Sequence, residues 1–224
     1  MFNFFIGVDQ SPNGTAVICL NDKGKINRML FYADSKKDVK KFMHVGAVES
    51  IKVKANDEVG GIKRLNNIRN TLNDFLNLYK NKRCIASMEG YTFARMAFSH
   101  SLGEVGGMIR MLFWERQLPY RVYDVQAVKI FATGKGNAKK GEIIEAIAEE
   151  YDLHFLKYGK ENGAAGNLAD AFIIAEMLRT EVMLREGLLE LKDLSENKRR
   201  VFLRVTKQNF TNVLDLPFII NEEK

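Results

Sequence analysis

The stretch FFIGVDQSPNGTAVIC, residues 4–19, places one acidic residue, Asp9, at the end of an apolar run. The run from Asn3 to Val8 is typical of a buried central strand. Burying a carboxylate is costly unless a partner or a cation compensates its charge. The turn-forming residues after Asp9 also allow a plainer interpretation, in which this side chain only caps a turn. Both interpretations stay open on this stretch alone.

The composition of the 224 residues indicates a folded chain with an anionic partner. Hydrophobic residues make up 46% of the chain, which is enough for a sizeable core. The net charge of +6 favours a partner such as nucleic acid or a membrane surface. Cys19 and Cys84 both lie in apolar runs, which favours reduced thiols. With neither a signal-peptide pattern nor a run long enough to span a bilayer, we expect a cytoplasmic protein without membrane contact.

The hydrophobic pattern predicts an α/β fold. Strands at 14–22 and 25–34 follow the first one, joined by the hairpin signal NDKG. We expect further elements, in chain order, as a helix at 62–79, a strand at 84–88, a helix at 101–117, a strand at 120–125, and helices at 125–132, 141–151 and 167–186. Residues 35–60 are expected to be irregular. Three strands in a meander followed by alternating helices and strands predict a mixed sheet with helices on its faces.

The C-terminal part of the chain differs in character from the rest. It contains ENKRR, a possible strand VFLRVT at 201–206, and the apolar run NVLDLPFII before a charged tail. We therefore expect one domain over residues 1–187 and a C-terminal appendage of unknown role over residues 188–224.

Three acidic residues interrupt apolar segments at Asp9, Glu89 and Asp170. Glu89 ends a predicted strand and Asp170 lies in the first turn of a predicted helix, so a turn and a favourable helix dipole explain each of them individually. If the sheet brings the three together, they need a cation in order to stay ionised. Oxygen ligands of this kind favour Mg²⁺ or Mn²⁺, and two such ions could drive hydrolysis of a phosphodiester.

Four motifs carry a resemblance to a known family. They are IGVDQSPNGTAV at 6–17, MEGY at 88–91, TGKGNAKKGE at 133–142 and NLADA at 167–171. In this order they resemble the RuvC-like Holliday junction resolvases of the ribonuclease H-like superfamily, and most closely the phage-type branch. The resemblance covers residues 4–178. It implies a five-stranded mixed sheet flanked by helices, a homodimer, and metal-dependent nicking of two strands of a four-way DNA junction.

The resemblance also implies roles for single residues. Asp9, Glu89 and Asp170 match the metal-binding, catalytic acids, which would hold two Mg²⁺ ions, with Mn²⁺ as a possible substitute. Asn167 stands where the family has Asp or His. Its amide oxygen can coordinate a hard cation but brings no charge, and Asn is equally suited to be a helix N-cap. Lys140 matches a lysine associated with DNA contact and catalysis.

The loop around two glycines is rich in lysine. Lys129 matches a second DNA-contacting lysine of the family, and Lys135 and Lys139 lie in the same segment as Lys140. The loop lacks the spacing and the following Ser or Thr of a P-loop, so we expect no nucleotide cofactor. A glycine loop that opens a helix can still present N–H groups and a positive dipole end to phosphate. A solvated run of charges is the alternative.

Two aromatic residues, Tyr91 and Phe93, closely follow Glu89. In the family an aromatic near this place stacks on a base of the opened junction, as aromatic side chains commonly do with unpaired bases. Packing in the core is an equally good explanation for either residue. Trp114 is expected in the core or in a dimer interface.

Several functions stay open beside junction resolution. The same chemistry could serve a broader range of branched DNA, such as flaps and forks. An actin-like ATPase or sugar kinase is a further class, but the chain is too short for two lobes and shows no repeat. A junction-binding protein without activity is a third possibility, which Asn167 keeps open and the three acids oppose.

Overall fold

Five strands form one mixed sheet in the order β3-β2-β1-β4-β5. The computed structural model describes residues 2–12, 14–32, 58–90 and 96–207. The strands are β1 (Phe4–Asp9), β2 (Ala16–Asn21), β3 (Ile26–Phe31), β4 (Cys84–Glu89) and β5 (Tyr120–Tyr123). β1 runs antiparallel to β2 and parallel to β4, so the expected five-stranded mixed sheet is confirmed.

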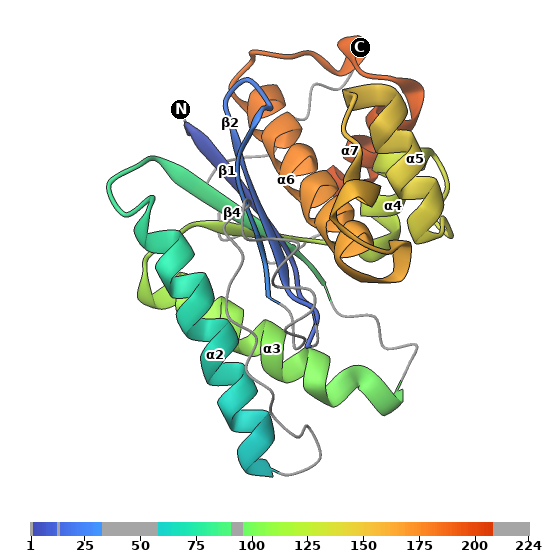
Figure 1. Cartoon of the computed structure of the whole chain (residues 1–224). Coiled ribbons are helices and arrows are strands. Elements are labelled where there is room, and N and C mark those ends of the chain that lie inside the picture. The colour runs from blue at the N-terminus through green and yellow to red at the C-terminus, as the bar shows by residue number, and fades with distance from the viewer. Residues whose placement is uncertain (1, 13, 33–57, 91–95, 208–224) are drawn as a thin grey trace.

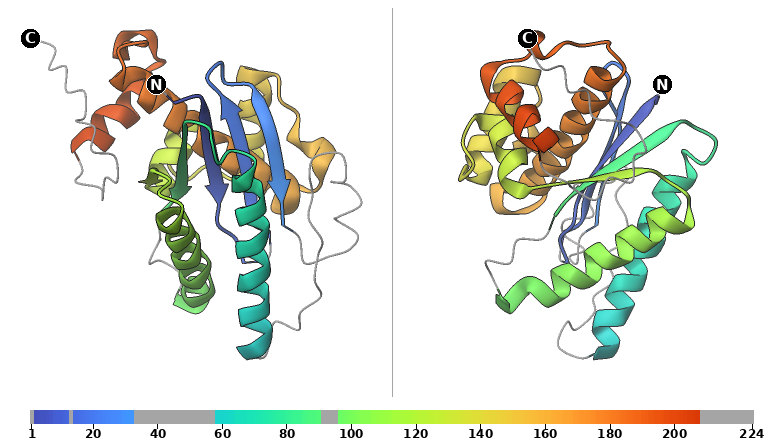
Figure 2. Two further views of the ribbon diagram at one scale, coloured as in Figure 1. Left: turned by 90° about the vertical axis from the view of Figure 1, so that its left-hand side faces the viewer. Right: turned by 180° about the vertical axis from the view of Figure 1, so that it is seen from behind.

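Helices cover both faces of this sheet, as Figure 1 and Figure 2 show. They are α2 (Glu58–Asn77), α3 (Met96–Glu115), α4 (Val125–Thr133), α5 (Lys140–Tyr151), α6 (Gly166–Arg185) and α7 (Glu196–Lys207). α2 and α3 cover one face, and α4 to α7 lie on the other. Among the described residues, none of the helices is long and apolar enough to cross a membrane.

Alternation along β1 and β4 assigns each side chain to one of two cores. Ile6 and Val8 of β1 pack with α2 and α3, whereas Phe5 packs with the core of α4 to α7. Successive side chains of a strand point to opposite faces. The odd-numbered positions of both strands therefore face α6, and these positions include Asp9 and Glu89.

α6 lies directly on β1 because β1 has a glycine where the two cross. A Cβ at Gly7 would lie 2.1 Å from the Ala171 carbonyl oxygen and 2.5 Å from the Ala175 nitrogen. Beside it on β4, Ser87 donates a hydrogen bond from Oγ to the Ile174 carbonyl oxygen at 3.0 Å. The helix backbone thus approaches the strands more closely than any residue other than glycine would allow.

A buried ion network holds the other end of α6 against β5. The Glu181 carboxylate accepts hydrogen bonds from Arg121 Nε at 3.2 Å, from Arg185 Nε at 3.0 Å and from the Tyr123 hydroxyl. Arg121 is fully buried and Glu181 is 3% exposed. Burial and the adjacent Glu181 charge raise the pKa of Tyr123, so its hydroxyl stays protonated and can donate. No local sequence pattern predicts this network.

The C-terminal segment corrects one prediction. Residues 201–206, expected as a strand, lie within α7. The side chains turned toward the protein are the partly buried Lys198 and the buried Val201 and Phe202, a spacing of three and four residues that fits a helix. A short apolar run does not by itself distinguish the two structures. Most of the region 35–60, expected as irregular, lies outside the described residues.

Cys19 and Cys84, expected as reduced thiols, are both free and buried in the structure. Burial raises the pKa of the Cys19 thiol to about 12 and that of Cys84 to about 11. Both groups therefore stay as neutral thiols within the core.

Replacing Glu181 by alanine should destabilise the protein by about 3–5 kcal/mol, because Arg121 would keep a buried charge without its carboxylate. Urea unfolding monitored by circular dichroism measures this loss. Lys192→Ala, which removes a well-exposed ion pair with Glu190, is the control and should leave the midpoint unchanged. Equal midpoints for the two variants would contradict the structural role of the network.

Candidate active site

Two of the predicted acids end neighbouring parallel strands. Val8 of β1 pairs with Met88 of β4, so Asp9 and Glu89 follow side by side at the carboxyl ends of the strands. Both face the α6 side of the sheet by alternation. Asp9 is 9% exposed, and Glu89 is partly buried. Ligand sites in sheets with parallel strands gather at this edge.

Asp170 joins them from α6. It precedes Ala171, whose carbonyl oxygen lies against Gly7 two residues before Asp9. The close crossing described above thus places the first turns of α6 over the end of β1. Burial and the Asp170 charge raise the pKa of Asp9 to about 7, although Lys140 acts in the opposite direction.

The three carboxyl groups interact electrostatically. Burial is the main cause that raises the pKa of Glu89 well above its usual range, followed by repulsion from Asp170 and Asp9. Burial likewise raises the pKa of Asp170, while Lys140 and Lys129 lower it. The structure therefore brings the three predicted acids to one end of the sheet, where their charges are poorly compensated.

Lys140 is the cation in contact with this group. It opens α5, and its Nζ lies 3.1 Å from Asp170 Oδ2. Burial alone would lower the pKa of its ammonium, but Asp170 and Asp9 raise it above its ordinary value, so the group stays charged. The stem of Lys140 passes Gly166, where a Cβ would lie 2.7 Å from its Cδ.

Asn167 is buried beside Lys140 and is not a helix cap. α6 begins at Gly166, so Asn167 lies inside the first turn and the N-cap alternative is wrong. Its Nδ2 donates to the Gly14 carbonyl oxygen at 2.7 Å, and its Oδ1 accepts a hydrogen bond from Lys140 Nζ. The contact with Gly14 fixes the amide so that its oxygen faces the charged groups.

Gln10 is a further residue of this site that was not predicted from the sequence. This side chain is 4% exposed, and its Nε2 donates to the Glu89 carbonyl oxygen at 2.9 Å. It thereby joins the ends of β1 and β4 just beyond their last paired residues. Its Oε1 is buried and lacks a hydrogen-bond partner in the part of the chain that the structure describes. The sequence offered one indication of this role, because Gln10 has a long amide side chain among residues that favour turns.

The predicted phosphate-binding lysines occupy different environments. Lys129 is half-buried and close enough to lower the pKa of Glu89. Lys135 and Lys139 are exposed, and Lys135 pairs with Glu142 at 2.9 Å. The first amides of α5 are also partnered, since Gly141 N–H donates to Glu161 Oε1 at 2.9 Å. A phosphate would have to displace these exposed carboxylates.

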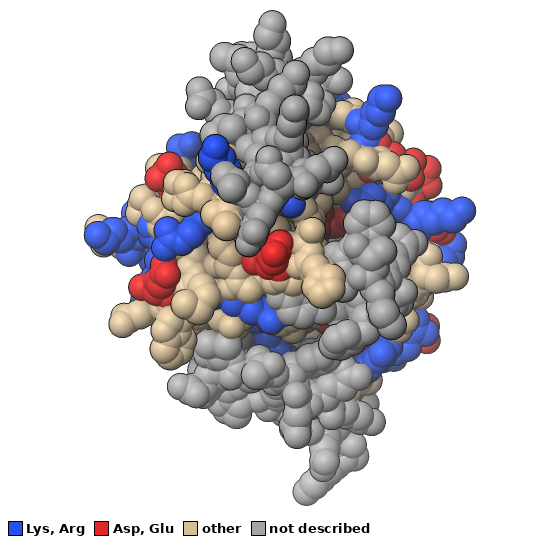
Figure 3. Space-filling view, turned by 90° about the horizontal axis from the view of Figure 1, so that it is seen from below, with Lys and Arg blue, Asp and Glu red and all other residues tan. Residues whose placement is uncertain are grey.

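Tyr91 and Phe93, predicted to contact DNA, lie outside the described residues. Figure 3 looks onto this end of the sheet, where Lys and Arg side chains are spread around an area that carries acidic side chains. The described residues include no group of three or more His, Cys, Asp and Glu side chains already arranged around one ion. The oxygen donors that the region offers are the three carboxylates and the Asn167 amide.

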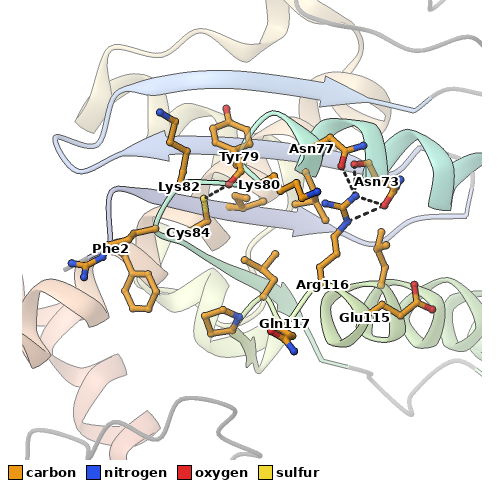
Figure 4. Close-up of a pocket in the computed structure, with 16 residues that line it drawn as sticks. Phe2, Asn73, Asn77, Tyr79, Lys80, Lys82, Cys84, Glu115, Arg116 and Gln117 are labelled. Carbon is orange, nitrogen blue, oxygen red and sulfur yellow. Dashed lines mark hydrogen bonds between the residues drawn. The ribbon is translucent and has the colours of Figure 1, made fainter.

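A cavity of about 800 Å³ lies at the opposite end of the sheet (Figure 4). It is bordered by the start of β4 at Cys84 and by the facing ends of α2 and α3. There Arg116 binds Asn73 and Asn77 with hydrogen bonds of 2.8 Å and 2.7 Å. The cavity is separated from Asp9 and Glu89 by the length of the strands, so it is not part of the carboxylate site.

Comparison with known proteins now decides the family. No model of a known protein family matches the sequence. A crossover junction endodeoxyribonuclease RuvC from Prochlorococcus marinus subsp. pastoris is 31% identical over 130 residues, which cover 58% of this chain and 77% of the relative. The chain belongs to the RuvC family. Another RuvC from Prochlorococcus marinus strain MIT 9312 is 27% identical over 61% of this chain and 81% of its own.

Solved RuvC structures share the fold. A Thermus thermophilus RuvC structure superposes with a TM-score of 0.53 at 18% identity, over 82% of this chain and 96% of the other. T. thermophilus RuvC in complex with Holliday junction substrate gives a TM-score of 0.54 at 14% identity, over 82% of this chain and 95% of the other. The predicted ribonuclease H-like architecture of a RuvC-like protein is therefore confirmed.

The variant Gly7→Ala should lose stability by about 1–3 kcal/mol, because its methyl group would collide with the α6 backbone. Gly61→Ala is the control, since a Cβ there meets nothing within 4 Å among the described residues. Removing this glycine from α2 should stabilise the protein by roughly 0.5–1 kcal/mol. Urea unfolding of both variants tests the pair, and a neutral Gly7→Ala would contradict the close crossing.

The metal-free protein should lose stability as the pH rises from about 4 to about 7. Asp9 has a folded-state pKa of about 7 against an ordinary 3.8, so the folded state binds the extra proton in this window. The protonated Asp9 carboxyl contributes its full stabilisation below pH 3.8, and this contribution falls as the carboxyl ionises in the folded protein. Thermal unfolding in EDTA measures the slope, and Asp9→Asn should reduce it but not abolish it, because the pKa values of Glu89 and Asp170 are also raised. The exposed Asp74→Asn should keep the wild-type slope; a flat wild-type profile would contradict the raised pKa.

Proposed function

We propose that this RuvC-family protein is a metal-dependent endonuclease that resolves four-way DNA junctions by paired hydrolysis of phosphodiester bonds. The observation that carries the proposal is the meeting of Asp9, Glu89 and Asp170 at one end of the sheet, beside the Lys140 ammonium. Acids that repel one another in a buried setting are characteristic of a functional site. Membership of the RuvC family supplies the substrate class.

The side chains present fit a divalent cation in their chemistry. Burial and mutual repulsion hold the pKa of Asp9 and Glu89 high, and a bound dication would favour their ionised forms. Carboxylate and amide oxygens are the donors that Mg²⁺ prefers, with Mn²⁺ as a substitute. We propose Asp9, Glu89 and Asp170 as ligands of two ions, with Asn167 contributing its amide oxygen. Lys140 would then have to move away from Asp170.

Bound ions would supply the positive charge that stabilises both the attacking water and the departing 3′ oxygen. The side chains of the protein would position the scissile phosphate beside the attacking water. Lys140 contacts Asp170 and Asn167 in the absence of DNA. When DNA binds, its ammonium can exchange the Asp170 carboxylate for a phosphate oxygen as its partner. Lys129 adds a second positive charge from α4. Gln10 keeps the ends of β1 and β4 in register, so the spacing of Asp9 and Glu89 is preserved.

Further features complete the proposal. Lys135 and Lys139 would contact the DNA backbone, and Tyr91 or Phe93 would stack on an opened base. We propose a homodimer, because two nicks need two sites; Trp114 and Met111, 75% and 58% exposed on α3, support a second copy there. Trp114 thus does not belong to the core.

The finer classification rests on the sequence motifs. We propose the phage-type branch, from the resemblance of those motifs, and a place in the cytoplasm. We also propose a nuclease domain over 1–187 and an appendage over 188–224. The appendage is joined to the domain through α7, whose Val201 and Phe202 are buried.

Cleavage of labelled DNA tests the proposal. Purified protein with Mg²⁺ should make paired symmetric nicks in a four-way junction and leave a linear duplex intact. Asp9→Asn and Glu89→Gln should abolish cleavage while junction binding persists. Each variant replaces a carboxylate proposed to coordinate metal by a neutral amide. The exposed Asp74→Asn is the control and should cleave normally. Equal cleavage of flaps and junctions would indicate a broader debranching nuclease, and binding without cleavage in Mg²⁺ or Mn²⁺ would overturn the nuclease proposal.

A further inference from the structure

α7 packs an apolar side onto α4 and leaves a basic side in solvent. Val201 and Phe202 are 2% and 3% exposed, and the Phe202 ring meets the Phe131 ring edge-on at 5.9 Å. Lys198 is also turned inward, with its Nζ 4.8 Å from the centre of the Phe131 ring and 2.8 Å from the Tyr151 hydroxyl. These contacts fix the rotation of α7 about its axis.

The same helix contacts the start of the lysine-rich loop. Arg200 donates a hydrogen bond to the Gly134 carbonyl oxygen at 3.0 Å. Gly134 ends α4 with a positive φ of 78°, and a Cβ there would lie 2.5 Å from Nδ2 of Asn197. The close approach of α7 and the left-handed backbone both require glycine at this position. α7 is thus attached to the segment that leads to Lys139 and Lys140.

The outward side of α7 carries arginines. Arg199, Arg200 and Arg204 are exposed, and Glu196 is the acidic residue of the helix. Lys198 contributes little to this surface because it pairs with Glu150. Arg200 thus links the exposed basic side of α7 to the start of the loop that carries Lys135, Lys139 and Lys140.

We propose that α7 binds the phosphate backbone of a duplex arm of the DNA substrate, extending the contact surface beyond the cleavage site. This inference rests on the proposed function for its substrate. One arginine guanidinium can donate two hydrogen bonds to the oxygens of a phosphate. Such contacts with the DNA backbone do not depend on the base sequence. The described side chains of α7 expose no aromatic ring for stacking on unpaired bases, which favours a duplex over a single strand.

The test compares DNA binding at several salt concentrations. Arg199→Gln with Arg204→Gln removes two outward charges and keeps the apolar contacts of α7 and the Arg200 bond. Fluorescence anisotropy with a labelled four-way junction in EDTA should show the slope of log K against log salt reduced by about 2, since each duplex phosphate contributes roughly 0.9. In Mg²⁺, half-maximal cleavage by this variant should require a higher DNA concentration than in the wild type.

Two further variants make the result decisive. Lys80→Gln with Lys82→Gln removes the same charge from exposed side chains at the opposite end of the sheet, and should keep the wild-type slope. Arg199→Lys with Arg204→Lys should restore most of the salt dependence. An unchanged slope in the arginine-to-glutamine variant, or an equal reduction in both glutamine variants, would overturn the role of α7. Wild-type protein that cleaves no junction would overturn the nuclease proposal instead, while the binding curves still test α7.

Discussion

The contact between α6 and β1 at Gly7 is the constraint on which the candidate site depends. Strand side chains normally keep a helix well above a sheet, but here the Ala171 carbonyl lies where a Cβ would stand. The close approach lets Asp170, in the first turns of α6, share its surroundings with Asp9 and Glu89. Without that crossing, three acids far apart in the chain would have no common site.

Charge balance at this end of the sheet is the second organising feature. The fold concentrates three carboxylates where water is largely excluded and provides the ammonium of Lys140 in direct contact. Asn167 adds a neutral amide beside Lys140, and its bond to Gly14 fixes the direction of that amide. The negative charge of the three acids is therefore compensated less fully than in a balanced cluster of ion pairs.

Much of the fold could be predicted because periodicity and turn residues act locally. The buried strand before Asp9, the hairpin after it and the long helices follow from such patterns. The acids were recognisable because each interrupts an apolar segment. The strand expected at 201–206 failed because burial of Val201 and Phe202 comes from tertiary packing on α4.

Other features were beyond a sequence-based prediction for the same reason. Gly7 and Gly166 have no Cβ, which leaves space for atoms of residues far away in the chain. A local sequence pattern does not reveal these neighbours. Gln10 resembled a turn residue until the end of β4 was placed beside it. The Arg121–Glu181 pair joins β5 to α6 across sixty positions, and no local spacing indicates it.

That pair has a consequence for how the molecule fluctuates. α6 is fastened at its first half by the glycine crossing and the Ser87 bond, and at its last half by Glu181. Partial opening events in proteins begin with the least anchored elements. We therefore expect α6 and the central strands to be the last part of the fold to open. Because Asp170 directly precedes the crossing at Ala171, its place over the end of β1 is held by the same contacts.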